Sequence, residues 1–541
     1  MSTSLNKLVN FEGRKGPVLL LILDGVGLGK EDDSNGVYLA KTPCLDKLIT
    51  SDLYTELKAH GTAVGMPADD DMGNSEVGHN ALGAGRIFAQ GAKLVQQDIR
   101  DGSIFETETW HQLLEQPKAG KTLHLLGLLS DGNVHAHIDH FKALASKAAE
   151  ENIKTIRFHV LLDGRDVFEQ SALEYIKDLE EHCAALKVKH DGDYRIASGG
   201  GRMTTTMDRY NADWAMVEKG WHTHVLGEAT TFASASEAVQ SYYDNNVKDQ
   251  YLDSFVVADE GKPIGAMQDG DSVVFMNFRG DRAMEMSMAF DFGDEFDKFE
   301  RKRKPDVFYV GMLQYDADLK IPLKYLVNPP KIDKAIGTYM CDLGLKSFAI
   351  SETQKYGHVT YFWNGNKSGY LNKDLEKYIE VPSDNIPFDQ KPKMKAYEIT
   401  EKATELLKSG EFQFGRINFP NGDMVGHTGV PEAIIETMEV TDACTAKLID
   451  VVNELGGITV VLADHGNADE MYIIKNGKKQ VSTAHSLNPV PCAIVDSTFN
   501  GEYKMATLDT PGLANIASTL LNLLGYEKPA NYEPSLIEFT K

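Results

Sequence analysis

The sequence predicts an α/β protein built from two α/β domains, because three features recur along its 541 residues. Short apolar runs end abruptly in polar, glycine-containing clusters, helical stretches separate the runs, and two kinds of charged cluster occupy different regions. Apolar runs of this length between helices are typical of buried parallel strands. A chain this long exceeds what one hydrophobic core usually accommodates, so a second domain is expected.

The strand predictions rest on five apolar runs. They cover residues 18–23, 123–129, 158–162, 273–276 and 458–463. Polar clusters such as Asp24-Gly25 and Asp464-His465-Gly466 follow them directly. In open parallel sheets, ligands gather beyond the carboxyl ends of the strands, so the functional residues are expected at these junctions.

A long helix is the clearest of the helical predictions. Pro431 occupies a first-turn position, apolar residues then recur at helical spacing, and Gly456-Gly457 marks the end. We find no internal repeat, low-complexity tract or heptad pattern.

Composition and charge exclude several classes of protein. The formal net charge is −25 and no block of Lys and Arg offers a binding surface for a phosphate backbone, so no nucleic-acid partner is expected. The five cysteines lie far apart without a CxxC pair, which is typical of a reducing compartment. The first residues lack an apolar signal core, and the run 18–23 is too short to span a bilayer. We therefore expect a cytoplasmic protein with no membrane partner.

Six side chains near the predicted strand ends are typical metal ligands. They are three carboxylates and three imidazoles: Asp24, Asp423, Asp464, His427, His465 and His485. Such a mixed set suits divalent ions, and divided three and three it could build the two adjacent sites used in phosphoryl displacement. Taken singly, an Asp-Gly after a strand is usually a turn and an Asp-His pair is usually accidental; their co-occurrence favours metal binding.

Ser75 is the candidate nucleophile, within the segment DMGNSEVGH at residues 71–79. Gly73 and Gly78 would let backbone amides approach an anion, and a serine that opens a helix would meet its positive end. A bound metal would lower the pKa of its hydroxyl. The alternative is that Ser75 only caps the following helix, and the local sequence does not decide between the two.

Arginine-containing motifs distinguish the middle of the chain. They are Asp163-Gly-Arg-Asp166, Gly199-Gly-Gly-Arg202, Asp208-Arg209 and Arg279-Gly-Asp-Arg282. Several converging guanidinium groups indicate a small substrate with more than one anionic group, whereas ordinary Arg–Asp surface pairs are the alternative. His135 and His137 follow a predicted strand and could carry protons, contact substrate or be structural, and Lys355 is a loop cation of undecided role.

Taken in order, ten motifs closely resemble those of the cofactor-independent phosphoglycerate mutases, a branch of the alkaline phosphatase superfamily. The matches are LDGVG (23–27), MGNSEVGHNALGAGRI (72–87), SDGNVHAH (130–137), LLDGRDV (161–167), MDRY (207–210), NFRGDRA (277–283), KYGHVTYFWNG (355–365), NFPNGDMVGHTG (418–429), ADHGNADEM (463–471) and TAHSLNPVP (483–491). The resemblance therefore extends from residue 23 to residue 491.

The resemblance implies a role for each candidate residue. One metal would be held by Asp423, His427 and His485, and the other by Asp24, Asp464 and His465 with Ser75 as a shared or adjacent ligand. Ser75 would take the phosphoryl group, Asp166 would move the proton of the accepting hydroxyl, and Lys355 would neutralise charge at the serine phosphate. The substrate would be bound by His135, Arg165, Asp166, Arg202, Arg209, Arg279, Arg282 and Lys355.

The resemblance also implies the reaction and the domain plan. The expected activity is interconversion of 3-phosphoglycerate and 2-phosphoglycerate in glycolysis and gluconeogenesis, with two divalent ions (Mn, Mg, Co or Zn) and no 2,3-bisphosphoglycerate. An alkaline-phosphatase-like metal domain would comprise residues 1–89 and 330–541, with an inserted Arg-rich substrate domain at 90–329. The family favours a monomer.

The nearest alternative is a metal-dependent phosphatase or phosphopentomutase of the same superfamily. Such an enzyme would keep the metal ligands but not the ordered arginine motifs. The non-enzymatic alternative is a binding or scaffold protein that keeps the fold but has lost catalysis. Such proteins usually lose a metal ligand or the nucleophile first, whereas the six candidate ligands and Ser75 are all present here.

Overall fold

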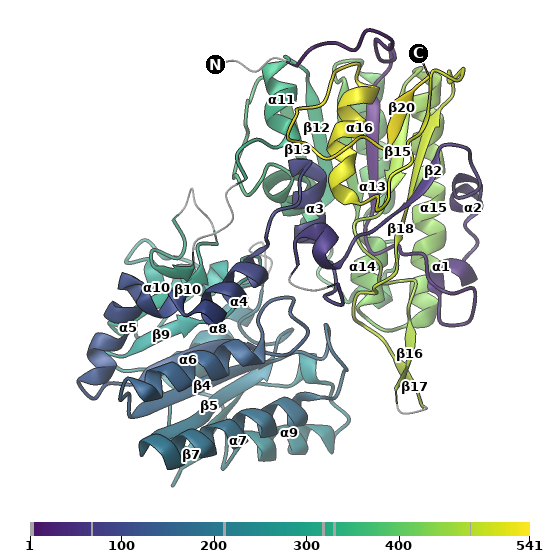
Figure 1. Cartoon of the computed structure of the whole chain (residues 1–541). Coiled ribbons are helices and arrows are strands. Elements are labelled where there is room, and N and C mark those ends of the chain that lie inside the picture. The colour runs from purple at the N-terminus through teal and green to yellow at the C-terminus, as the bar shows by residue number, and fades with distance from the viewer. Residues whose placement is uncertain are drawn as a thin grey trace. The chain divides into compact units, whose positions relative to one another are not determined.

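The computed structural model describes residues 5–66, 69–208, 213–315, 320–327, 332–475 and 478–540. The chain divides into two compact units, one formed by residues 1–90 and 331–541 and the other by residues 91–330. Each unit has a sheet with packed helices, so the predicted fold of two α/β domains is confirmed (Figure 1).

The sheet of the first unit contains seven strands among the described residues. Their order across the sheet is β13 (Glu376–Val381), β12 (Ser347–Glu352), β14 (Phe414–Phe419), β1 (Val18–Leu23), β15 (Ile458–Leu462), β18 (Val490–Asp496) and β2 (Tyr54–Leu57). The first five run parallel, and β18 pairs antiparallel with both β15 and β2. Strand β1 lies at the centre and is buried along its whole length, as expected for a continuous apolar run.

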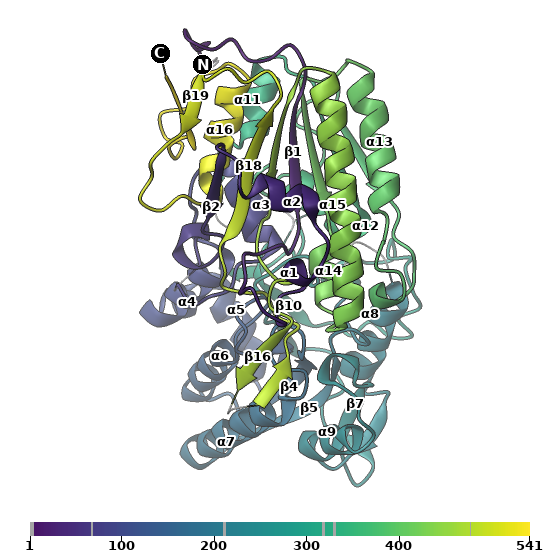
Figure 2. The same ribbon diagram turned by 90° about the vertical axis from the view of Figure 1, so that its right-hand side faces the viewer.

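Helices cover both faces of this sheet. Figure 2 shows α13 (Ala396–Lys408) and α15 (Pro431–Glu454) on one side, and α3 (Ser75–Ala84), α11 (Ile336–Asp342) and α16 (Ile516–Leu523) on the other. Helix α15 begins with Pro431 at its first position, and Gly456 follows its end at φ 66°, so the prediction of this helix is confirmed. The other α-helices described in this unit are α1 (Gly36–Leu39), α2 (Pro43–Leu48), α12 (Thr353–Gly357) and α14 (Asn421–Gly426). Two antiparallel pairs of strands lie apart from the main sheet, β16 (Tyr472–Lys475) with β17 (Lys478–Val481) and β19 (Tyr503–Met505) with β20 (Ile537–Phe539).

The second unit has its own sheet. Its order is β11 (Tyr325–Val327), β10 (Phe308–Leu313), β9 (Ser272–Phe275), β3 (Leu123–Leu129), β4 (Thr155–Leu162), β5 (Asp193–Gly201), β7 (Phe255–Asp259) and β6 (Thr230–Phe232), with β8 (Lys262–Pro263) paired to β7. Strands β9, β3, β4 and β5 are adjacent and parallel, whereas β7 runs antiparallel to β5.

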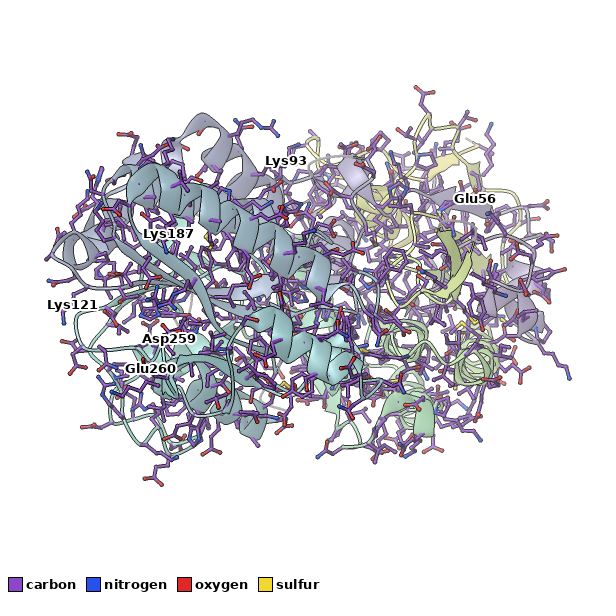
Figure 3. The ribbon with its side chains drawn as sticks, turned by 90° about the horizontal axis from the view of Figure 1, so that it is seen from below. Glu56, Lys93, Lys121, Lys187, Asp259 and Glu260 are labelled. Carbon is purple, nitrogen blue, oxygen red and sulfur yellow. The ribbon has the colours of Figure 1, made fainter. Side chains whose placement is uncertain are left out.

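The helices of the second unit are α4 (Gly91–Asp101), α5 (Glu108–Lys118), α6 (Ile138–Glu150), α7 (Ala172–His190), α8 (Trp214–Gly220), α9 (Ala235–Tyr243) and α10 (Met284–Asp291). Helices α6 and α7 pack side by side on the sheet (Figure 1). Exposed charges mark the outside of this unit, such as Lys187 on α7 and Asp259 and Glu260 at the turn between β7 and β8 (Figure 3).

All five predicted apolar runs form strands, namely β1, β3, β4, β9 and β15. Strand β4 begins at Thr155, three residues before the predicted run, because Thr155, Ile156 and Arg157 continue the parallel pairing with β5. None of the helices in the described part of the chain combines the length and apolarity needed to cross a membrane. The five cysteines, all of which are described, are free thiols.

Candidate active site

The carboxyl edge of the first sheet gathers the predicted metal ligands. Asp24 follows β1 directly, Asp464 follows β15, and Asp423 lies in α14, which follows β14. Because these three strands are adjacent and parallel, their following residues meet at one edge of the sheet. His485 precedes β18, whose antiparallel pairing with β15 brings its amino end to the same edge. All of these side chains are buried.

One tight group consists of Asp423, His427 and His485. Nε2 of His427 lies 2.9 Å from Oδ1 of Asp423, Nε2 of His485 lies 3.1 Å from the same oxygen, and the two Nε2 atoms are 3.2 Å apart. Asp423 and His485 could also be grouped with His465. Nε2 of His465 is 3.9 Å from Oδ1 of Asp423, however, so the shorter distances favour His427 as the third member.

The second group consists of Asp24, Asp464 and His465. One potential ligand atom from each lies within 4.8 Å of the others. Nε2 of His465 is 3.4 Å from Oδ1 of Asp24 and 4.0 Å from Oδ2 of Asp464. The two groups are therefore adjacent, with His465 close to both.

Backbone carbonyls orient the three imidazoles. Nδ1 lies 2.5 Å from the Thr483 carbonyl in His427, 2.7 Å from the Gly73 carbonyl in His485 and 3.2 Å from the Gly466 carbonyl in His465. A carbonyl only accepts, so Nδ1 donates and the lone pair of a neutral ring resides on Nε2. The three Nε2 atoms converge on the carboxylates, so the residues present fit a pair of divalent ions.

Charge compensation perturbs the pKa values in this cluster. Burial alone would raise the pKa of Asp24, but Lys355 and His465 outweigh it and hold this pKa well below its usual value. For Asp423, burial is likewise outweighed by His427 and Lys355, and the pKa is lowered. Burial disfavours the charged form of His465, yet Asp464, Asp24 and Asp423 together raise its pKa to about 9. The carboxylates therefore stay ionised and attract cations.

Ser75 is the first residue of α3 and does not cap it. The side chain of Asn74 accepts the hydrogen bonds from the Glu76 and Val77 amides, so the capping alternative for Ser75 is wrong. Its hydroxyl therefore faces the two groups of potential metal ligands, which together form the metal-type cluster (Asp24, Asp423, His427, Asp464, His465 and His485). Ser75 Oγ donates to Oδ1 of Asp24 at 3.1 Å and lies 2.9 Å from Nε2 of His465.

Lys355 joins the two groups. It lies on the helical turn α12 rather than on a loop as predicted, because the turn begins directly after β12. Its ammonium is 2.9 Å from Oδ1 of Asp24 and 2.7 Å from Oδ2 of Asp423, and it donates to the hydroxyl of Ser75. The side chain is buried, so this positive charge acts with little solvent screening.

The carboxyl edge of the second sheet gathers the predicted substrate residues. His135 lies in the loop after β3, Arg165 and Asp166 follow β4, Arg202 follows β5, and Arg279 and Arg282 follow β9. These four strands are adjacent and parallel, so the loops meet at one edge. Arg209 was also predicted to bind substrate, but it lies outside the described residues.

Arg202 is fully buried and pairs with two carboxylates. Its NH1 group is 2.7 Å from Oδ1 of Asp163 and also contacts Oδ2 of Asp166. The alternative of ordinary surface pairing therefore does not describe Arg202. It does describe Arg195, whose side chain is 39% exposed and pairs with Asp193 and Asp259.

The two histidines after β3 differ in role. Nδ1 of His137 accepts the Asp139 amide at 3.2 Å, so His137 caps α6. His135 is buried, with Nδ1 3.5 Å from Oδ1 of Asp281. The same oxygen lies 3.3 Å from Nε of Arg279, so His135 and Arg279 share one buried carboxylate.

A further arginine of this edge, Arg282, donates to the Met207 carbonyl.

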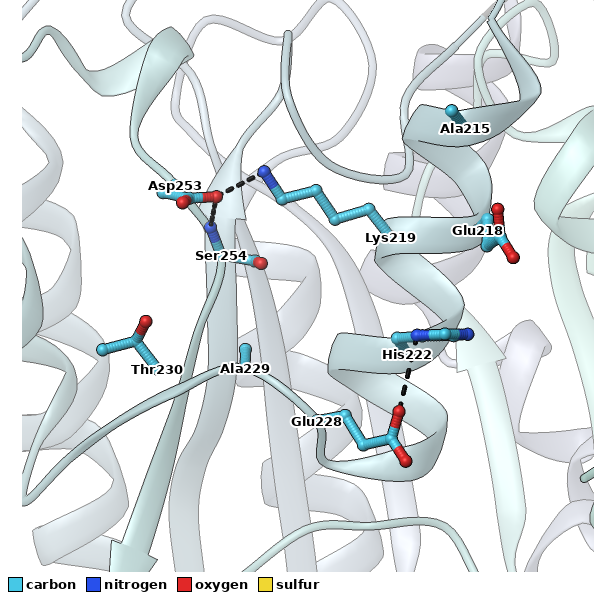
Figure 4. Close-up of a pocket in the computed structure, with 9 residues that line it drawn as sticks. All are labelled: Ala215, Glu218, Lys219, His222, Glu228, Ala229, Thr230, Asp253 and Ser254. Atoms are coloured by element: carbon cyan, nitrogen blue, oxygen red, sulfur yellow. Dashed lines mark hydrogen bonds and ion pairs between the residues drawn. The ribbon is translucent and has the colours of Figure 1, made fainter. Parts of the chain in front are cut away.

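An open pocket of about 450 Å³ lies elsewhere on the second unit (Figure 4). Four of its side chains form two pairs, Lys219 with Asp253 and His222 with Glu228 at 3.4 Å. None of the predicted substrate residues lines it. We assign no ligand to this pocket.

Comparison with known proteins gives the family. A family model described as the Metalloenzyme superfamily matches residues 16–528. A protein of Leptospira interrogans named a probable 2,3-bisphosphoglycerate-independent phosphoglycerate mutase is 52% identical, with 99% of both chains covered. The chain belongs to the 2,3-bisphosphoglycerate-independent phosphoglycerate mutases. The mutase of that name from Trypanosoma brucei brucei is 48% identical, with 96% of this chain and 97% of the relative covered.

A solved structure of the same family supports the fold. The phosphoglycerate mutase of Leishmania mexicana, crystallised at low cobalt concentration, superimposes with a TM-score of 0.96. It is 47% identical, and the match covers 99% of this chain and 100% of that chain. The prediction of a phosphoglycerate mutase of this family, and thus of an isomerase, is confirmed.

Sequence reasoning missed several buried residues that support this phosphoglycerate mutase site. Oδ1 of Asp163 accepts the amides of Arg165 at 3.2 Å and Asp166 at 3.0 Å, besides binding Arg202. Oδ2 of Asp163 accepts the Ser130 hydroxyl at 2.6 Å. One carboxylate thus fixes the loops after β3, β4 and β5. Its place at the end of the strand predicted at 158–162 was the available signal.

Behind the metal-type cluster, Asn418 and His79 were also missed. The Asn418 amide donates to Oδ2 of Asp24 at 2.7 Å and lies 3.3 Å from Nε2 of His79. Nδ1 of His79 is 2.7 Å from the Ser75 carbonyl and 3.3 Å from Oδ2 of Asp464. Both lie inside family motifs, but their polar side chains gave no sign of which ligands they contact.

Proposed function

We propose that this chain interconverts 3-phosphoglycerate and 2-phosphoglycerate through a phosphoserine at Ser75, as a step of glycolysis and gluconeogenesis. The observation that carries this proposal is the position of the Ser75 hydroxyl. Its oxygen lies within hydrogen-bonding distance of Asp24 and His465 and in contact with Lys355. Two potential metal ligands and a cation therefore surround the atom that would act as the nucleophile.

Two divalent ions would complete this site. Asp423, His427 and His485 would hold one, and Asp24, Asp464 and His465 the other, with Ser75 as an adjacent or shared ligand. Once bound, they would supply Lewis-acid stabilisation of the phosphoryl oxygens and lower the pKa of the serine hydroxyl. The mixed carboxylate and imidazole donors accept Mn, Mg, Co or Zn.

The chain's own residues then act in two steps. In the first step Ser75 Oγ gives up its hydroxyl proton and attacks phosphorus in line, the bond from phosphorus to the 3-oxygen breaks, and the 3-oxygen takes up one proton, so that the number of protons is unchanged. Lys355 offsets the negative charge that accumulates around the reacting group. In the second step the 2-hydroxyl of glycerate gives its proton to Asp166 and attacks phosphorus, the bond from phosphorus to Ser75 Oγ breaks, and Oγ takes up one proton, which restores the Ser75 hydroxyl.

Residues of the second unit would bind the glycerate and phosphate oxygens, with Lys355 of the first unit as a further cation. Guanidinium groups bind such oxygens bidentately, and we assign this role to Arg165, Arg202, Arg209, Arg279 and Arg282, together with His135 and Lys355. Fixing the glycerate retains it after it has lost its phosphoryl group, which separates a mutase from a phosphatase. No 2,3-bisphosphoglycerate is needed, because Ser75 itself stores the phosphoryl group.

The free thiols support a cytoplasmic location, and the acidic net charge argues against a nucleic-acid partner. Membership of the family favours a monomer without a membrane partner. The main alternative activities are those of a metal-dependent phosphatase or a phosphopentomutase of the same superfamily. The relatives named as phosphoglycerate mutases, and the ordered arginine motifs of the second unit, favour a small carboxylated substrate over these.

The proposal is tested by incubating the purified protein with 3-phosphoglycerate and no bisphosphoglycerate, and coupling 2-phosphoglycerate formation to enolase. Isomerisation that disappears after chelation and returns with Mn²⁺ supports it. Release of inorganic phosphate in place of isomerisation would favour the phosphatase alternative. Isomerisation that persists after complete demetallation would overturn the two-metal site.

A further inference from the structure

A carboxylate outside the metal-type cluster connects the segments that carry it. Asp469 lies in the loop between β15 and β16, five residues after Asp464, and its side chain is 1% exposed. Oδ1 accepts the Gly27 amide at 3.1 Å. Oδ2 accepts the hydroxyl of Ser486 and the amide group of Asn488, both at 2.7 Å.

Each donor belongs to a segment that holds a metal-type ligand. Gly27 is three residues after Asp24, Ser486 adjoins His485, and Asp469 shares a loop with Asp464 and His465. Asp24 and Asp464 belong to one proposed metal site and His485 to the other. A single buried carboxylate therefore ties together segments from both sites.

The packing leaves this carboxylate little freedom to move. A Cβ atom placed on Gly27 would lie 2.5 Å from the Asp469 carboxylate, and one on Gly466 would lie 2.6 Å from its Oδ1. Backbone hydrogen bonds reinforce the same contacts, from Asn467 to the Gly25 carbonyl at 3.0 Å and from Ser486 to the Gly466 carbonyl at 3.0 Å. Glycine at positions 27 and 466 is what allows so close an approach.

The hydrogen bonds of this residue need an acceptor at both side-chain oxygens. Three donors face the two oxygens of Asp469, and a carboxylate accepts from all of them. The amide of an asparagine at this position would turn its NH₂ group toward one of the donors. A buried donor left without its acceptor would no longer hold its segment in place.

We propose that Asp469 is a positioning residue that sets the spacing between the two metal sites. Its hydrogen-bond partners Gly27, Ser486 and Asn488 are not among the proposed metal ligands or substrate residues. Asp469 therefore acts through the segments carrying Asp24, Asp464, His465 and His485. The inference rests on the proposed function, because it assumes that these residues bind a pair of ions about 3.5–4 Å apart, as in two-metal phosphoryl-transfer sites.

The test is electron paramagnetic resonance of the full-length protein titrated with Mn²⁺, because the exchange-coupled signal of a Mn²⁺ pair depends on the distance between the ions. We expect Asp469→Asn to lose the coupled signal and to bind the second Mn²⁺ at least tenfold more weakly. Ser486→Ala, which removes one of the three donors and disturbs packing less, is expected to shift both readouts in the same direction by a smaller amount.

The matched control is Asp442→Asn. Asp442 is an equally buried carboxylate of the same unit that accepts the backbone amides of Cys44 and Leu45 at 3.1 and 2.8 Å, away from the metal-type cluster. This variant is expected to keep the coupled signal.

The proposal is overturned if Asp469→Asn keeps the coupled signal and the wild-type Mn²⁺ affinity, or if Asp442→Asn loses both to the same extent. If the wild-type protein binds no Mn²⁺ pair, the two-metal site fails first and the inference falls with it.

Discussion

The Oγ atom of Ser75 lies 2.9 Å from Nε2 of His465, although the two residues are 390 positions apart in the chain. Ser75 opens a helix, and His465 follows the strand next to the central one. The contact depends on three features: the cap that starts α3, the parallel strands that align the loops, and the cation that holds the hydroxyl. The cap and the cation can each be removed by a single substitution.

The helix cap is tested by replacing Asn74. Asn74→Ala removes the acceptor for the Glu76 and Val77 amides and should destabilise the first unit by about 1 kcal/mol. Because Ser75 is the next residue, we also expect kcat to fall. Asn74→Asp keeps a capping oxygen and should retain the stability in thermal unfolding. Equal losses in both variants would show that capping does not position Ser75.

The buried cation is tested by Lys355→Met, which keeps much of the side-chain volume and removes the charge. We expect kcat to fall about 10²–10³-fold, as when a group that stabilises transition-state charge is lost. The measurement is steady-state isomerisation at saturating Mn²⁺. Lys346→Met, at an exposed lysine paired with Glu411 in the same unit, is the control and should keep wild-type kcat. A wild-type kcat in Lys355→Met would contradict the assigned role.

The substrate loops are tested by Asp163→Asn, which weakens the bonds to Arg202 and Ser130 and to the amides of Arg165 and Asp166. Loss of charge-assisted hydrogen bonds of about 1.5–3 kcal/mol should raise KM for 3-phosphoglycerate about tenfold to a hundredfold. The Mn²⁺ affinity should stay unchanged, because these residues belong to the other unit. The control is Asp259→Asn on the exposed turn. An unchanged KM would refute the organising role of Asp163.

Glu352 provides a test of pH dependence. Burial raises the pKa of this carboxyl from 4.5 to about 7, with the Lys395 amide and charge acting in the opposite direction. Because the pKa of Glu352 is higher in the native state than in the unfolded state, the native state binds more protons between these two values. This carboxyl therefore contributes stability that is fully present below pH 4.5 and is lost as the pH rises through 7. The pKa rise corresponds to a loss of about 3 kcal/mol in the free energy of unfolding.

Glu352→Gln should remove this pH dependence. We expect the variant to gain stability relative to the wild type on going from pH 5 to pH 8, measured by denaturant unfolding. Glu401→Gln at an exposed position of α13 should show no such gain. A constant difference between wild type and Glu352→Gln at both pH values would rule out the raised pKa.

The sequence predicted those parts of the fold that depend on local patterns. Continuous apolar runs located β1 and β3 because strands covered on both faces need apolar side chains throughout. The start of β4 was missed because Arg157 interrupts the pattern, while its guanidinium reaches the Asp193 carboxylate and backbone carbonyls. The partner of the buried Arg157 guanidinium lies on the neighbouring strand β5, so the sequence around Arg157 does not indicate that a strand continues through it.

In the candidate site too, features that depend on local sequence were predictable, whereas contacts between distant segments were not. Asp24 and Asp464 were predictable because each stands at the end of a recognisable strand. Whether Ser75 caps the helix was not predictable, since Ser and the preceding Asn74 are both capping residue types and only the backbone decides which one precedes the first turn. The contacts of Asp163 and Asp469 join segments distant in sequence, and only the folded chain shows them.

The most direct test of the central claim is to locate the phosphoryl group during turnover. The protein, loaded with Mn²⁺, is mixed with 3-phosphoglycerate labelled with ³²P, quenched within milliseconds, digested and sequenced by mass spectrometry. We predict label on Ser75 in the wild type, and neither label nor isomerisation in Ser75→Ala with its metal content retained. Label on another residue, or isomerisation by Ser75→Ala, would contradict the account.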